Sequence, residues 1–162
     1  MKKYVRSLII GLFIAIFSAS AYALPVRPCG GEVTVSFAPG NPFEGLNITN
    51  QYQSYGINFL DGNIVQGGRF YNPAKFDFMD NSTVCEVTIV LKDWNDHTQS
   101  HSLLAYDKYG RILDKAIVRE DGLDPMPAMP MILTVKHPRI SSVAVVNEPQ
   151  GATELLSITY SK

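Results

Sequence analysis

The sequence has few cysteines, little tryptophan and no excess of charge of either sign. Two cysteines and one tryptophan occur in 162 residues, and charged side chains make up 18% of the chain. Two cysteines are too few for a disulfide-dense scaffold or for a zinc site with four thiolates. The 14 basic and 15 acidic side chains nearly cancel, which excludes a protein that binds nucleic acid through bulk positive charge.

Apolar residues make up 46% of the chain, which is typical of a globular protein. The length predicts one domain. The sequence contains neither a phosphate-cradling glycine loop nor a Gly-x-Ser-x-Gly nucleophile elbow. We therefore expect a non-catalytic protein without a cofactor.

The first 23 residues have the pattern of a signal peptide. Three basic residues precede an apolar run over 8–17, and Ala21-Tyr22-Ala23 supplies a small-x-small cleavage site. The run is too short to cross a bilayer. We expect cleavage of 1–23 in a bacterium, leaving a soluble domain over 24–162 that is periplasmic or secreted and not held in the membrane. Removal of three basic side chains leaves 11 against 15 acidic ones, a net charge of −4.

The two cysteines, Cys29 and Cys85, suit such a compartment, because an oxidising environment would pair them. A catalytic redox pair usually has much closer spacing. We predict a structural disulfide that closes a 56-residue loop, worth about 4 kcal/mol in the chain-entropy model.

Nine short segments rich in β-branched and aromatic residues are separated by turn residues. They cover 33–37, 56–59, 76–78, 84–91, 103–106, 112–118, 131–135, 142–146 and 155–160. The one helical candidate is a single turn at 48–52. Asp107-Lys108-Tyr109-Gly110 predicts a hairpin turn in which glycine supplies a positive φ. This spacing predicts an all-β, two-sheet antiparallel sandwich of jelly-roll type, with a closed barrel as the alternative.

Two motifs carry a family resemblance. Residues 48–59 read I-x-x-Q-Y-x-x-x-G-I-x-F, and residues 105–110 read A-Y-D-x-x-G. The chain resembles bacterial secreted β-sandwich domains found in proteins with PEP-CTERM sorting tails, which are similar to galactose-binding-like jelly rolls. The resemblance implies a binding module whose partner is a glycan or a cell-surface polymer. Ala38 and either Leu155 or Leu156 stand where that family often has acidic residues, with Glu154 nearby, so the resemblance gives no support for a structural calcium site.

Within the first motif, Tyr52 and Tyr55 are three residues apart, and one helical turn would place them on a common side. Gly56 then allows a sharp turn into the next strand. We expect Tyr52 to close one end of the core. Stacking of its ring on a ligand is the alternative.

Two predicted loops hold an aromatic residue beside polar side chains. One contributes Asp93, Trp94 and Asn95, and the other contributes Arg69, Tyr71 and Asn72. Sugar recognition needs this mixture, because a sugar ring has an apolar face and a rim of hydroxyl groups. We predict these six residues as the ligand-binding surface. A core position for Trp94 is the alternative.

Two further segments carry side chains that could bind a metal. His97 and His101 are four apart, but they lie between two predicted strands without a nearby glutamate base, so we expect a solvated loop. Met126, Met129 and Met131 offer thioethers that suit Cu(I). A periplasmic copper-handling protein is therefore an alternative function, and a protein-interaction domain that uses a sheet edge is another. No metal site is predicted.

Overall fold

The computed structural model describes residues 29–37, 50–60, 64–65, 69–70, 74–79, 82–93, 100–119, 130–148 and 153–162, with the backbone alone at 64–65, 69–70 and 93. The predicted leader lies outside these residues. The described chain contains one 3-10 helix, η1 (Gln53–Tyr55), and eleven strands. The strands are β1 Glu32–Ser36, β2 Ile57–Phe59, β3 Ile64–Val65, β4 Arg69–Phe70, β5 Ala74–Phe78, β6 Val84–Asp93, β7 Ser100–Tyr106, β8 Ile112–Arg119, β9 Met131–Ile140, β10 Ser142–Glu148 and β11 Thr153–Ser161.

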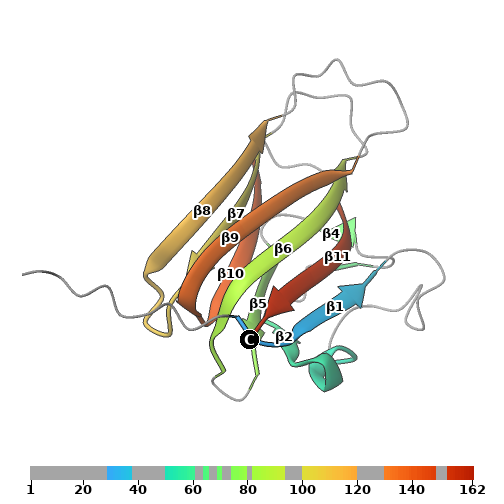
Figure 1. Ribbon diagram of the computed structural model, residues 1–162. Helices are drawn as coiled ribbons and strands as arrows, with labels where there is room; N and C mark the ends of the chain where they lie inside the picture. Colours follow the sequence, from blue (N-terminus) through green and yellow to red (C-terminus); the bar gives the residue numbers. More distant parts are fainter. Residues whose placement is uncertain are drawn as a thin grey trace, which may run out of the picture.

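The strands form two antiparallel sheets that lie one over the other (Figure 1). Sheet A has the order β3-β4-β11-β6-β9, and β1 also pairs with β11; sheet B has the order β2-β5-β10-β7-β8. The predicted all-β, two-sheet antiparallel sandwich is confirmed, and all nine predicted segments form strands.

The pairing is nested in the manner of a jelly roll. Along the chain, β1 pairs with β11, β5 with β10, β6 with β9 and β7 with β8. This is the pattern that one long hairpin produces when it is rolled into two sheets. No strand pairing joins the two sheets within the described residues, so the alternative of a closed barrel is not observed.

The core lies between the sheets because the strands bury alternate side chains. Strand β5 buries Ala74, Phe76 and Phe78, and its two intervening side chains face outward. A series of aromatic ring contacts continues from Phe78 to Tyr160, whose ring centroids are 5.0 Å apart. This packing explains why short strands with few apolar residues each can still build one continuous core.

Tyr52 occupies the core position predicted for it. Its side chain is only 3% exposed, and its ring centroid lies 4.6 Å from that of Phe37. The 3-10 helix covers Gln53–Tyr55, just after Tyr52, and ends at Gly56 with φ +80°; residues 48–49 of the turn predicted at 48–52 lie outside the described residues. Ligand stacking by Tyr52 is therefore excluded by its burial.

Strand β9 is longer than the sequence predicts, because it continues past 135 to Ile140 and includes Pro138. Its register with β6 shifts between Val84 and Glu86, opposite the segment that contains this proline. Proline has no N–H for the ladder and is tolerated at edge strands and bulges. Both conditions hold here, since β9 is the edge of sheet A.

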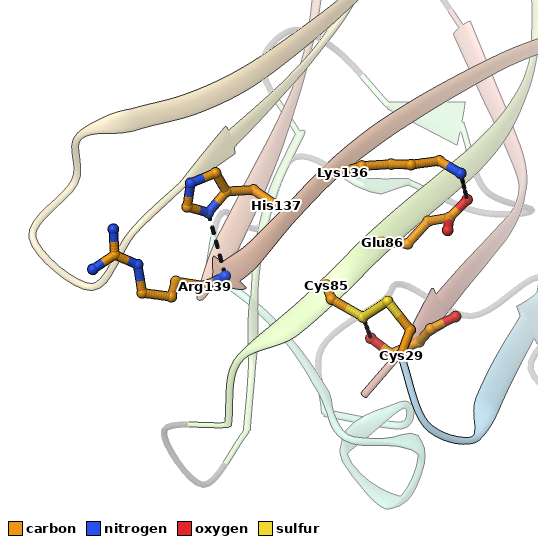
Figure 2. The surroundings of a disulfide bond; sticks show 7 residues. Cys29, Cys85, Glu86, Lys136, His137 and Arg139 are labelled. Carbon is orange, nitrogen blue, oxygen red and sulfur yellow. Dashed lines mark hydrogen bonds and ion pairs between the residues drawn. A yellow bond between two sulfur atoms is a disulfide. The ribbon is translucent and has the colours of Figure 1, made fainter. Parts of the chain in front are cut away.

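The predicted Cys29–Cys85 disulfide is present, with Cα atoms 5.9 Å apart (Figure 2). Cys29 precedes β1 and Cys85 lies on β6, and β11 runs between these two strands. The bridge therefore crosses the end of β11, where the Gly30 N–H donates to the Lys162 carbonyl. A disulfide of this kind fits an oxidising, extracytoplasmic compartment. Among the described residues, no helix is long and apolar enough to span a membrane.

Candidate functional site

A groove of about 800 Å³ lies beside the β7–β8 turn and over the outer face of sheet B. We call this end of the sandwich the hairpin end, and the opposite end the far end. The groove is lined by Leu60, Lys75, Asp77, Phe78, Ser82, Thr83, Asp107, Lys108, Tyr109, Gly110, Arg111, Arg139, Ser141 and Ser142. Its volume is in the range of small-molecule and sugar sites.

The β7–β8 turn is held by one carboxylate. Asp107 accepts hydrogen bonds from the backbone N–H groups of Tyr109 (2.9 Å) and Arg111 (3.0 Å), and from Nε of Arg111 (2.7 Å). Gly110 adopts φ +77° and donates its N–H to the Asp107 carbonyl. The predicted turn and its positive φ are confirmed. These bonds fix the backbone on both sides of Tyr109.

Tyr109 projects from the turn, and 72% of it is exposed. Two cations lie near its ring: Nζ of Lys108 is 5.0 Å and Cζ of Arg111 is 5.4 Å from the ring centroid. Both distances allow cation–π attraction, which limits the rotamers of the exposed ring. The turn therefore presents a positioned aromatic surface at the edge of the groove.

The rest of the groove comes from other strands. Lys75 and Asp77 point outward from β5, and Nζ of Lys75 lies 5.5 Å from the ring centroid of Tyr106. The β9–β10 connection adds Ser141, and β9 adds Arg139, which extends toward the β7–β8 turn (Figure 2). Burial raises the pKa of Asp77, and the nearby charge of Lys75 partly offsets this effect.

The β7–β8 turn should be more stable when the Asp107 carboxyl group is ionised than when it is protonated. Partial burial acts to raise its pKa, but the hydrogen bonds from Arg111 and Tyr109 outweigh burial and hold the pKa below its usual value. A lowered pKa stabilises the folded turn above the ordinary carboxyl pKa, and this contribution is lost as the pH falls through the folded value.

We therefore expect the amide protons of Tyr109 and Arg111 to lose protection below about pH 4, measured by NMR hydrogen exchange between pH 3 and 7. At pH 7, Asp107→Asn should give these two amides lower protection factors, and the factors should vary little with pH once the intrinsic pH dependence of exchange is divided out. If the two amides exchange with the same pH dependence in both proteins, the carboxylate does not organise this turn.

Of the six residues predicted from sequence as the ligand-binding surface, Arg69 and Asp93 are described, and their strands β4 and β6 end at the far end, the upper end in Figure 1. Phe70 of β4 and Asp93 of β6 lie in register on either side of Thr153 of β11. Strands β4 and β6 both run antiparallel to β11. They therefore run parallel to each other, and their backbones are about 10 Å apart. Four predicted residues lie outside the described part of the chain: Tyr71, Asn72, Trp94 and Asn95.

The other two predicted residues, Arg69 and Asp93, lie in paired strands. In register, Arg69 is opposite Glu154, and Lys92 lies on the other side of the same glutamate. Glu154 is only 8% exposed. On the described side, the register places Lys92 opposite this acidic residue, and an opposite-charge pair of this kind stabilises strand pairing.

His101 differs from its expected place in a solvated loop. It lies in β7 and is fully buried, and its Nδ1 is 2.9 Å from Oδ1 of Asn147. Asn147 in turn donates from Nδ2 to Thr153 Oγ1 at 2.8 Å. This last bond joins sheet B to sheet A, so the three side chains form a polar layer beneath the far end. His97 lies outside the described residues.

The structure bears on only part of the methionine-rich segment. Met131 begins β9 and packs against the hydrophobic core, whereas Met126 and Met129 lie outside the described residues. Within the described part of the chain, no group of three or more His, Cys, Asp or Glu side chains is placed to hold a metal ion.

The groove at the hairpin end is not predicted by the sequence. The A-Y-D-x-x-G motif predicts a turn, and nothing local indicates that Lys75, Arg139 and Ser141 meet it. The one available signal is Tyr109 at the tip of the turn, flanked by Lys108 and Arg111.

Comparisons with protein-family models, with curated proteins and with solved structures give no match for this chain. The description that follows from fold and site alone is a disulfide-linked, jelly-roll β-sandwich with a mixed aromatic and charged groove.

Proposed function

We propose that the protein is a secreted, non-catalytic binding module for a glycan or a cell-surface polymer, and that the polymer lies in the groove beside Tyr109. The observation that carries this proposal is the exposed Tyr109 ring at the edge of a groove of about 800 Å³. An aromatic face beside polar groups is the combination that sugar binding requires.

The polar groups of the groove suit a hydroxylated ligand. Ser82, Thr83, Ser141 and Ser142 line it, together with the carboxylate of Asp77. Hydroxyl groups can both donate and accept hydrogen bonds, and a carboxylate accepts them. These groups could pair with the hydroxyl rim of a sugar while Tyr109 covers its apolar face.

A binding role also fits the carboxylates of the groove. Glycoside hydrolysis generally needs two carboxyl groups that act on the scissile bond. Among the described residues, the carboxylates that line this groove are Asp77 and Asp107, and Asp107 already accepts hydrogen bonds from Arg111 and Tyr109. The residues that line the groove therefore support binding better than hydrolysis.

Secretion is part of the same proposal. Residues 1–23 have the composition of a signal peptide, and a structural disulfide fits an oxidising compartment. The resemblance to bacterial secreted sandwich domains points in the same direction. A module of this kind would meet polymers outside the cytoplasm.

Tyr109→Ala should weaken binding to any glycan found on an array by at least fivefold, about 1 kcal/mol, while the fold is unchanged. Titration calorimetry with the best array ligand would measure this loss. Tyr109→Phe keeps the ring and should bind nearly as well as the parent. Ile132→Ala removes another exposed apolar side chain, 64% exposed and on the other sheet, and should have no effect.

A Trp94→Ala variant separates this groove from the ligand-binding surface predicted from sequence. If Trp94→Ala abolishes glycan binding and Tyr109→Ala leaves it intact, the ligand binds at the surface predicted from sequence and the groove is not the site. If the protein binds no glycan or surface polymer at all, the proposed function is wrong.

A further inference from the structure

We infer that the polymer recognised by the groove is an acidic polysaccharide whose sugar rings carry carboxylate groups, a polyuronate. This inference rests on the proposed function and adds the chemical class of the ligand. Two observations support it: cationic side chains surround Tyr109, and they belong to several different strands.

The described residues that line the groove carry a net positive charge, although the whole chain carries a slight negative one. Among the described residues that line it, four are cations, Lys75, Lys108, Arg111 and Arg139, and two are carboxylates, Asp77 and Asp107. The whole chain carries a net charge of −1, and −4 without its first 23 residues. Four of the 11 basic residues after the leader thus gather at one groove, and such local concentration attracts anions.

The cations surround the groove instead of lying along one element. Lys75 comes from β5, Arg139 from β9, and the other two from the β7–β8 turn. Strands far apart in sequence therefore contribute positive charge to the same groove. A ligand with one charge on each sugar could contact several of these cations at once.

Arg111 remains able to bind an anion although it is paired. Its NH2 group lies 2.6 Å from Asp107 Oδ2, yet 69% of its side chain is exposed. A guanidinium has five N–H donors in a planar fork. Its pairing with Asp107 uses one side of that fork and holds the group in place, which reduces the entropy lost when a second carboxylate binds.

The tyrosine distinguishes a polyuronate from other polyanions. Nζ of Lys108 and Cζ of Arg111 lie 5.0 and 5.4 Å from the Tyr109 ring centroid. A pyranose stacked on that ring would hold its carboxylate beside these two cations. A chain of glycerol phosphates has charge but no sugar ring for Tyr109 to contact, so the aromatic surface would add nothing to its binding.

The test compares polygalacturonate with its fully methyl-esterified form, which has the same backbone without charge. Calorimetry at 50 and 300 mM NaCl should show at least tenfold tighter binding of the acidic polymer at low salt, with the difference shrinking at high salt. Arg139→Gln and Lys75→Gln should each weaken binding of the acid form about fivefold. Arg119→Gln, at the far end of β8, is the matched control and should leave it unchanged.

Three outcomes would overturn the inference. Equal binding of the acid and ester forms would mean that the groove binds glycans whether or not they are charged. The proposed function would then still hold. Equal binding of a poly(glycerol phosphate) and polygalacturonate would mean that the groove recognises only the negative charge of the polymer. Binding of neutral array glycans without any binding of polygalacturonate would exclude uronates as ligands, whereas failure to bind any glycan would contradict the proposed function itself.

Discussion

Replacement of both bridged cysteines, Cys29→Ser with Cys85→Ser, should lower the free energy of unfolding by about 4 kcal/mol. The bridge closes a 56-residue separation, and its loss returns conformational freedom to the unfolded chain. Urea unfolding of the double variant and the parent would measure the difference. Adding a reductant to the parent should reproduce most of the loss.

The same change should have a local effect that depends on the topology. The bridge joins the residue before β1 to β6 across the end of β11, where the Lys162 N–H donates to the Gly31 carbonyl at 3.3 Å. In the double variant, amides of β1 and of the last residues of β11 should exchange before those of β7 and β10. Uniform loss of protection, or thiols that alkylate freely in the native parent protein, would show that the bridge does not hold this edge.

Gly56→Ala should destabilise the fold by about 2–5 kcal/mol, by two separate effects. Gly56 has φ +80°, where an L-residue costs about 1–2 kcal/mol. A Cβ there would also lie 2.8 Å from Oη of Tyr160. That hydroxyl donates to the Tyr55 carbonyl, and the Tyr160 side chain is buried, so the ring has little room to move away; such crowding costs about 1–3 kcal/mol.

Gly110→Ala is the matched control, because Gly110 has φ +77° but nothing lies within 4 Å of the place that a Cβ would take. It should lose only the backbone contribution, about 1–2 kcal/mol. Denaturant unfolding of both variants isolates the contact at Gly56. Addition of Tyr160→Phe to Gly56→Ala should recover part of the difference. Equal losses at the two glycines would show that the contact with Tyr160 carries no energy.

Local pattern is a reliable guide where burial depends on period-two alternation. In β5, for example, Phe76 and Phe78 face the core while Lys75 and Asp77 do not, as alternation requires. The turn at Asp107–Gly110 is predictable because its carboxylate and its positive φ act within four residues. The disulfide is predictable for a different reason, since only two cysteines exist to be paired.

Prediction fails where a polar residue is buried by distant partners. The polar sequence neighbours of His101 favour a solvated loop. In β7 every second side chain is buried, and His101 is one of these buried side chains. Asn147 of β10 is the hydrogen-bond partner of the imidazole. That partner is 46 residues away, so no local pattern could show that the imidazole would be buried at acceptable cost.

The sequence by itself determined the all-β class, the strand segments, the turn at Asp107, the core position of Tyr52 and the identity of the disulfide. Each of these depends on side-chain periodicity, on short-range hydrogen bonds or on composition. Only the tertiary structure decided which strands are neighbours, and therefore that Lys75, Tyr109 and Arg139 line one groove. Strand pairing brings together residues far apart in the chain through backbone hydrogen bonds that nearly every residue can make, so the sequence of one strand does not specify its partner.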